Sequence, residues 1–180
     1  DRGAILPAGH TANGAFWMGK SGEWISSSYY YEQLPEWLIK FQQKKPATSY
    51  FKGAWKGRGF GYPMDSLLAS KGPASVKSTP QGNTYLKDLA IELIKSEELG
   101  KDKITDVLTL SFSSTDYIGH QFGPHAQELI DTYIKLDKDI AEILQHINST
   151  IGQENALIFL TADHGVVSVC LLYTSDAADE

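Results

Sequence analysis

The sequence has one cysteine, no apolar run long enough to cross a membrane and no excess of basic residues. A membrane-spanning helix needs about 18 or more consecutive apolar residues, so we expect no membrane span. The net charge of −6 argues against a nucleic-acid-binding surface, which is usually broad and basic. The ordinary apolar and charged fractions are typical of a soluble globular protein, and 180 residues suffice for one domain.

The two ends of the chain look unlike natural termini. The sequence begins at Asp1 without methionine or signal peptide, so we interpret it as a piece of a longer protein whose compartment the missing signal does not reveal. Residues 170–180 resemble the translation of a sequencing-library adapter; the alternative is a natural tail. We therefore expect a partial domain at residues 1–169 and a non-native tail at 170–180. Because the only cysteine, Cys170, lies in that tail, it says nothing about redox compartment.

Residue patterns along the chain predict an α/β organisation with a mostly parallel sheet. Apolar runs predict strands, and helical spacing of apolar residues predicts helices. The expected elements are strands at 4–6, 107–112 and 156–161, a hairpin within 15–28, and helices at 35–41, from an Asn83 N-cap to Gly100, and at 126–147. Residues 44–82 lack clear periodicity and suggest a functional loop or an insertion. Their cations Lys52, Lys56 and Arg58 form either a small basic patch or a solvated loop face.

An acidic residue and a histidine follow each of the two later strand patterns. Asp116 and His120 come after residues 107–112, and Asp163 and His164 come directly after 156–161. A strand, a crossover helix and a strand form a βαβ unit with parallel strands, whose carboxyl ends meet at one sheet edge. Carboxylate and imidazole without thiolate suit Zn²⁺ or a similar first-row ion, so the sequence predicts two metal ions there.

Each of these acid–histidine couples also has a simpler interpretation. Asp116 can cap a turn while His120 packs locally, and Asp163 can form an Asx-turn beside an incidental histidine. Neither couple supplies three protein ligands, so further ligands have to come from elsewhere. Outside the couples, His10 either supports the site indirectly or is structural. We expect His125 to lie at a helix start, and His146 to face solvent or to stabilise the end of its helix.

Three segments resemble the alkaline phosphatase superfamily: residues 1–10 (DRGAILPAGH), 113–124 (SSTDYIGHQFGP) and 161–165 (TADHG). The closest branch is that of bacterial alkaline phosphatases with a threonine nucleophile, related to type I phosphodiesterases/nucleotide pyrophosphatases. The resemblance covers residues 1–169 and implies an incomplete three-layer αβα sandwich. It also implies that Asp116 and His120 bind one zinc, that Asp163 and His164 bind the other, and that Arg2 contacts the phosphoryl oxygens of the substrate.

The resemblance further implies a zinc-dependent phosphatase that hydrolyses phosphate monoesters through a two-metal site. The nucleophilic threonine and an aspartate ligand would lie upstream of this chain, and a third histidine ligand downstream. An arginine contacting two phosphoryl oxygens favours a dianionic monoester over a diester. The alternatives are a phosphodiesterase or nucleotide pyrophosphatase and a non-catalytic metal-binding member. The expected partners are small-molecule phosphate esters, and the expected location is periplasmic or otherwise extracytoplasmic.

Overall fold

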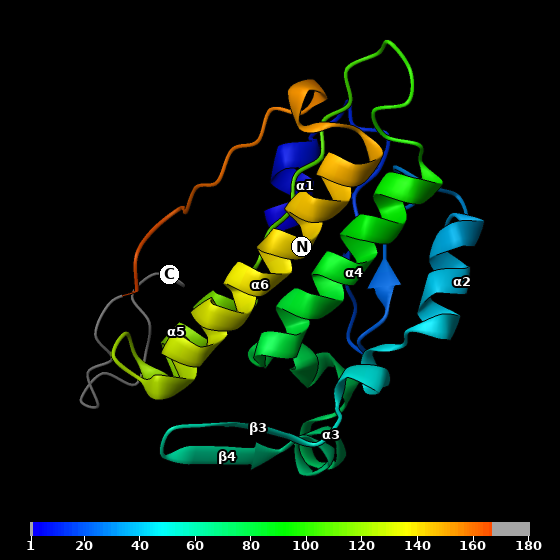
Figure 1. Cartoon of the computed structure of the whole chain (residues 1–180). Helices are drawn as coiled ribbons and strands as arrows, with labels where there is room; N and C mark the ends of the chain where they lie inside the picture. Colours follow the sequence, from blue (N-terminus) through cyan, green and yellow to red (C-terminus); the bar gives the residue numbers. More distant parts are fainter. Residues whose placement is uncertain (1, 167–180) are drawn as a thin grey trace.

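Two long helices, α4 (Pro80–Ser96) and α6 (Gln127–Thr150), lie side by side at the centre of the molecule (Figure 1). The structure is a computed structural model that describes residues 2–166. The other elements are α1 (Arg2–Ala8), β1 (Trp17–Met18), β2 (Trp24–Ile25), α2 (Glu36–Lys44), β3 (Ala54–Gly57), β4 (Phe60–Pro63), α3 (Met64–Lys71), α5 (Ser114–Phe122) and three short 3₁₀ helices at Ala47–Tyr50, Pro73–Ser78 and Gln153–Asn155.

The side chains that join α4 to α6 show that the two helices are parallel. The Thr84 hydroxyl donates to Asp139 at 2.9 Å, and one turn further along both helices the Lys87 ammonium donates to Glu142 at 2.7 Å. The chain between them therefore has to return along their length, as it does in a βαβ unit. Residues 107–112 lie on this return, so the helix arrangement is that of an α/β fold.

The core is built around one buried tyrosine of α4. Tyr85 is fully buried and packs against the aromatic rings of Trp24, Phe41 and Tyr50. These rings come from β2, α2 and the first 3₁₀ helix, so one side chain of α4 joins three separate segments. Elements α2, α4 and α6 confirm the helices that apolar spacing predicts, with ends shifted by a few residues.

Two antiparallel hairpins complete the described fold. Trp17 pairs with Ile25 in the β1–β2 hairpin, which confirms the hairpin expected within 15–28. The β3–β4 hairpin lies in the stretch that showed no periodicity. It is attached to α6 because the Trp55 indole donates to Asp131 and the Tyr62 hydroxyl donates to Glu128, both at 2.8 Å.

The three predicted strands do not form, and this corrects the sequence analysis. Residues 4–6 belong to helix α1, while residues 107–112 and 156–161 are extended without a paired strand anywhere in residues 2–166. A strand is stable only when its backbone groups and apolar side chains have a neighbour. Val107 is 85% exposed and Phe159 is 83% exposed, so the apolar side chains of these two segments lack the packing neighbours that a sheet needs.

The start of α4 also differs from the sequence prediction. Asn83, expected as an N-cap, lies inside α4, which begins at Pro80 after Thr79. Pro80 fits that position because the first turn of a helix needs no N–H donor there. The expected tail at residues 170–180 lies outside the described residues. No helix within residues 2–166 has the length and apolarity that crossing a membrane requires.

Candidate functional site

The sequence analysis expected Asp116 and His120 on a loop, but they lie one turn apart on helix α5. Their four-residue spacing places both side chains on one face of the helix. The Nε2 atom of His120 lies 3.2 Å from an Asp116 carboxylate oxygen, and both side chains are about half exposed to solvent. The Asp116 carboxylate and the His120 imidazole could therefore supply two ligands to one metal ion from the same helical turn.

Helix α5 is positioned by contacts at both of its ends. At its start, the buried side-chain oxygen of Asn83 accepts the backbone N–H of Ser114 at 3.3 Å. Ile118, fully buried, attaches the middle of the helix to the core. At its end, Gly123 has a φ of 85°, a conformation that favours glycine, and its N–H donates to Gly119 at 2.8 Å. Local sequence patterns do not reveal this role of Asn83, because its partner lies 31 residues away.

The second couple, Asp163 and His164, lies at the exposed end of the extended segment that starts at residue 156. The backbone N–H of His164 donates to Asp163 at 3.0 Å, and the His164 Nε2 atom lies 3.6 Å from the other carboxylate oxygen. The Nδ1 atom of His164 is 3.0 Å from the Gly165 carbonyl oxygen. These local bonds agree with a turn, and they leave the carboxylate 89% exposed, where it remains accessible to an ion.

The structure brings the second couple back to the helix that carries the first. Val166 is partly buried and packs against the core, and a Cβ atom placed on Gly119 would lie only 3.0 Å from its Cγ2. Gly119 is adjacent to His120, and Val166 is two residues beyond His164. Since an extended chain spans at most about 3.6 Å per residue, Asp163 lies within roughly 11 Å of Val166 along the backbone.

The second couple therefore lies on a segment that returns to α5, but the two couples do not close into one cluster. Within residues 2–166 no three or more histidine, cysteine, aspartate or glutamate side chains gather closely enough to hold an ion. The donor set fits zinc in kind, since two carboxylates and two imidazoles suit a borderline divalent cation. It is incomplete in number, since each couple provides two of the roughly four ligands that zinc takes.

Arg2, the expected phosphoryl contact, is the first residue of α1. A Cβ atom placed on the next residue, Gly3, would lie 2.5 Å from the hydroxyl oxygen of Ser111. Helix α1 thus begins against the segment that runs directly into α5. The backbone of α1 and the helix that carries Asp116 are consequently joined through Ser111 and Ser113, whose hydroxyls are 3.2 Å apart.

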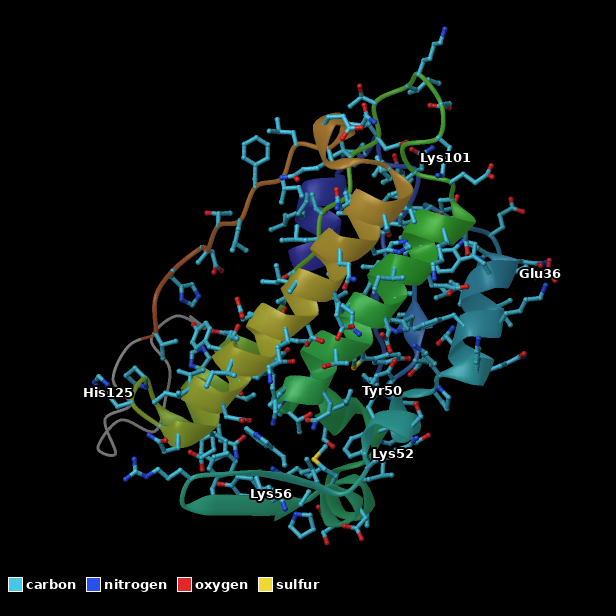
Figure 2. All side chains as sticks on the ribbon, viewed as in Figure 1. Glu36, Tyr50, Lys52, Lys56, Lys101 and His125 are labelled. Atoms are coloured by element: carbon cyan, nitrogen blue, oxygen red, sulfur yellow. The ribbon has the colours of Figure 1, made fainter. Side chains whose placement is uncertain are left out.

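The remaining sequence candidates lie at the surface or at helix ends. His125 is exposed in the turn between α5 and α6, at the edge of the molecule in Figure 2. Burial and the nearby Lys95 and Lys101 lower the pKa of His146, near the end of α6. Lys52 and Lys56, labelled in Figure 2, are exposed, as is Arg58 at the tip of the β3–β4 hairpin.

Comparison with known proteins gives consistent matches. The model of the family described as type I phosphodiesterase / nucleotide pyrophosphatase matches residues 3–179. A Myroides odoratus protein named calcium-transporting ATPase is 42% identical over 197 residues, covering 92% of this chain and 35% of the relative. Alkaline phosphatase PhoV of Synechococcus elongatus is 40% identical over 198 residues, covering 94% of this chain and 36% of the relative.

A solved structure agrees with these sequence matches. The crystal structure of wild-type alkaline phosphatase PafA has a TM-score of 0.74 at 35% identity, and covers 86% of this chain and 35% of that one. This likeness confirms the predicted fold class, an incomplete α/β fold of the alkaline phosphatase type. The chain spans about a third of the length of the relatives it matches.

Proposed function

Because the chain belongs to the type I phosphodiesterase / nucleotide pyrophosphatase family, in its alkaline phosphatase branch, we propose that it is part of a metal-dependent phosphoric ester hydrolase. The complete protein hydrolyses phosphate monoesters at a site that holds two zinc ions. In this proposal Asp116 and His120 bind one ion, and Asp163 and His164 bind the other. The substrates are small-molecule phosphate esters, and the complete protein acts outside the cytoplasm.

The observation that carries the proposal is the contact between Gly119 and Val166. It holds the end of the segment that carries Asp163 and His164 against α5, the helix that presents Asp116 and His120, although Gly119 and Val166 lie far apart in the sequence. Two adjacent ions need donors from both couples, and this contact supports their proximity. If Asp163 and His164 only formed a local turn, the chain after them would have no need to pack against α5.

Within the chain, the residues of each couple hold one another in place. The Asp116 carboxylate lies 3.2 Å from the His120 ring nitrogen, which limits the orientations of the imidazole. The Asp163 carboxylate accepts the N–H of His164 and so fixes its own rotamer against the backbone. When bound, paired zinc ions would stabilise the charge on the attacking and leaving oxygens of the ester. Arg2 would contact the non-bridging oxygens, which favours a dianionic monoester.

The experiment uses the complete protein, loaded with zinc, and compares p-nitrophenyl phosphate with bis(p-nitrophenyl) phosphate. We expect the monoester to be cleaved much faster. Replacing a ligand, as in Asp116→Asn or His164→Ala, should lower kcat/KM by at least about a hundredfold, since even the groups that support metal ligands contribute 10–100-fold. His125→Ala is the matched control, because His125 is an exposed histidine close to α5 that belongs to neither couple.

The other outcomes separate the alternative functions. Equal rates for the two esters, or faster cleavage of the diester, would identify a phosphodiesterase or nucleotide pyrophosphatase, the activity in the description of the matched family. Zinc bound in full without turnover of either ester would identify a non-catalytic metal-binding member. Loss of activity in His125→Ala equal to that in His164→Ala would contradict the assignment of the couples.

A further inference from the structure

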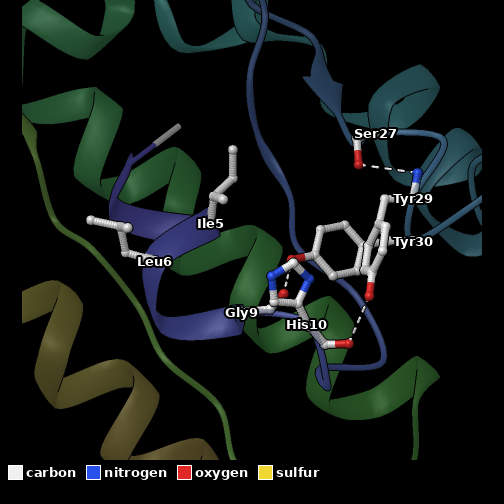
Figure 3. A pocket seen from close by; sticks show the side chains of 7 residues that line it. All are labelled: Ile5, Leu6, Gly9, His10, Ser27, Tyr29 and Tyr30. Atoms are coloured by element: carbon white, nitrogen blue, oxygen red, sulfur yellow. Dashed lines mark hydrogen bonds between the residues drawn. The ribbon is translucent and has the colours of Figure 1, made fainter.

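A cavity in the described part of the chain lies beside α1, and no residue of the acid–histidine couples lines it (Figure 3). Its volume is about 320 Å³, at the lower end of the range for small-molecule sites. Helix α1 and the residues after it form one wall, and the turn after β2 forms the other. The lining residues are Ile5, Leu6, Gly9, His10, Ser27, Tyr29 and Tyr30.

The aromatic wall of this pocket is held in place by hydrogen bonds to the opposite wall. The Tyr29 hydroxyl donates to the His10 carbonyl oxygen at 3.0 Å, and the Tyr30 hydroxyl donates to that of Gly9 at 2.6 Å. The two tyrosine rings meet edge to face, with centroids 5.1 Å apart. The Ser27 side-chain oxygen accepts the N–H of Tyr29 at 3.2 Å, which fixes the turn.

The chemistry of the lining selects an apolar, flat occupant. Both tyrosine hydroxyls already donate to backbone carbonyls, so the surfaces that remain available are mainly ring faces, including that of the His10 imidazole, and aliphatic groups. Leu6 is 77% exposed and Tyr29 is 61% exposed, which is unusual for large apolar side chains on opposite walls of one cavity. No carboxylate, lysine or arginine lines the pocket. An aromatic ring fits this surface, because it can stack on or meet the edge of a tyrosine.

The position of the pocket connects it to the candidate site. Helix α1 begins at Arg2, packs through Gly3 against Ser111, and lines the pocket with Ile5 and Leu6. Since a helix rises about 1.5 Å per residue, Leu6 lies only about 6 Å along α1 from Arg2. A phosphate ester held at the start of α1 would therefore have its organic group within reach of the pocket.

We propose that this pocket binds the aryl group of an aromatic phosphate ester. The inference rests on the proposed function and makes it more specific, since it names aryl phosphates as the preferred substrate class. Tyr29 and Leu6 contact the ring from opposite walls and determine that preference. The metal-binding couples take no part in this contact.

The test measures binding to the 180-residue chain itself, by saturation-transfer NMR and calorimetry. The probes are 1-naphthol, 1-naphthyl phosphate and methyl phosphate. We expect both naphthyl compounds to bind and methyl phosphate to bind at least about tenfold more weakly. Tyr29→Ala should weaken naphthol binding about tenfold, as the loss of an aromatic contact and its buried area implies. Leu6→Gln, which alters an exposed side chain, should weaken it in the same direction even if Tyr29→Ala fails to fold.

Tyr133→Ala is the matched control, because Tyr133 is an exposed tyrosine of α6 outside the pocket. Its binding should equal that of the unmodified chain. The proposal would be overturned if Tyr29→Ala and Leu6→Gln left naphthol binding unchanged. It would also be overturned if Tyr133→Ala weakened naphthol binding as much as they do. Since naphthol carries no phosphate, the pocket is tested independently of hydrolysis. Absence of phosphatase activity in the complete protein would overturn the proposed function without affecting this result.

Discussion

The Thr84 hydroxyl donates a hydrogen bond to the Asp139 carboxylate at 2.9 Å, across the interface between α4 and α6. Asp139 is only 5% exposed, and its burial raises its pKa to about 6, above the ordinary value of 3.8. The Thr84 hydrogen bond and the nearby Lys87 lower the pKa and thus offset part of this effect. Because the folded-state pKa exceeds the unfolded one, folding favours the protonated carboxyl group.

We expect Asp139→Asn to raise the free energy of unfolding at pH 7–8 by about 1–3 kcal/mol, since a pKa shift of one unit corresponds to about 1.4 kcal/mol. The buried charge lowers stability fully above pH 6 and has no such effect below about pH 4, where Asp139 is protonated in both states. Urea unfolding at pH 4, 6 and 8 measures the difference. Asp137→Asn, which alters an exposed aspartate of α6, should show no comparable pH dependence.

Lys87 provides a second test of the same interface. Its side chain is 8% exposed, and its ammonium lies 2.9 Å from Asp88 and 2.7 Å from Glu142. Burial alone would lower the pKa of Lys87, but these hydrogen bonds raise it overall. Its contribution to stability is therefore present at neutral pH and is lost as the pH rises above 10.5 through the folded-state pKa.

Lys87→Met should lower the free energy of unfolding at pH 7 by about 2–4 kcal/mol, because it removes a charged partner of the mostly buried Asp88 carboxylate. Asp88 keeps its bonds to Lys45 and Tyr50, so we expect the lower part of that range. Chemical denaturation measures the change. Lys138→Met, at an exposed position of α6, is the control; an equal loss in both variants would contradict the role of the buried ion pairs.

Sequence patterns predicted α2, α4 and α6 but not α1, α3 or α5, because helical spacing is clearest where a segment makes its contacts on one face. Strand pairing depends instead on partners distant in sequence, and residues 107–112 and 156–161 have none among residues 2–166. The β3–β4 hairpin showed no periodicity because its aromatic residues, including Trp55 and Tyr62, pack across the molecule onto Phe122. The two acid–histidine couples stay candidates predicted from sequence, whereas the contact between Gly119 and Val166 required the structure.

The exposed extended segment 156–161 gives a prediction about association. Leu157, Phe159 and Leu160 are each about 80% exposed, and their backbone has no partner strand in the described part of the chain. An unpaired apolar strand of this kind pairs readily with other chains. We expect the 180-residue chain to self-associate, and the double substitution Leu157→Lys and Phe159→Lys to reduce association in sedimentation experiments. Ile134→Lys, at an exposed position of α6, should reduce it much less.

Gly119→Ala tests the contact on which the proposed two-metal arrangement depends. Alanine favours a helix by about 1 kcal/mol relative to glycine, so α5 itself should not be weakened. The new Cβ, however, would lie 3.0 Å from Val166, so the end of the segment that carries Asp163 and His164 has to shift away from α5 by a few tenths of an ångström. In the complete protein, we expect several-fold more zinc to be needed for half-maximal hydrolysis. NMR contacts between residue 119 and the Val166 methyl groups should weaken in parallel.

Gly165→Ala separates this effect from a general effect of substituting glycine near the site. A Cβ at Gly165 meets no atom within 4 Å, although the residue adjoins His164. Its zinc requirement should therefore stay close to that of the unmodified protein. If Gly119→Ala left the zinc requirement unchanged while the contacts to Val166 were lost, the proximity of the two couples would have no role in binding the metal. Each couple would then bind its ion independently of the other.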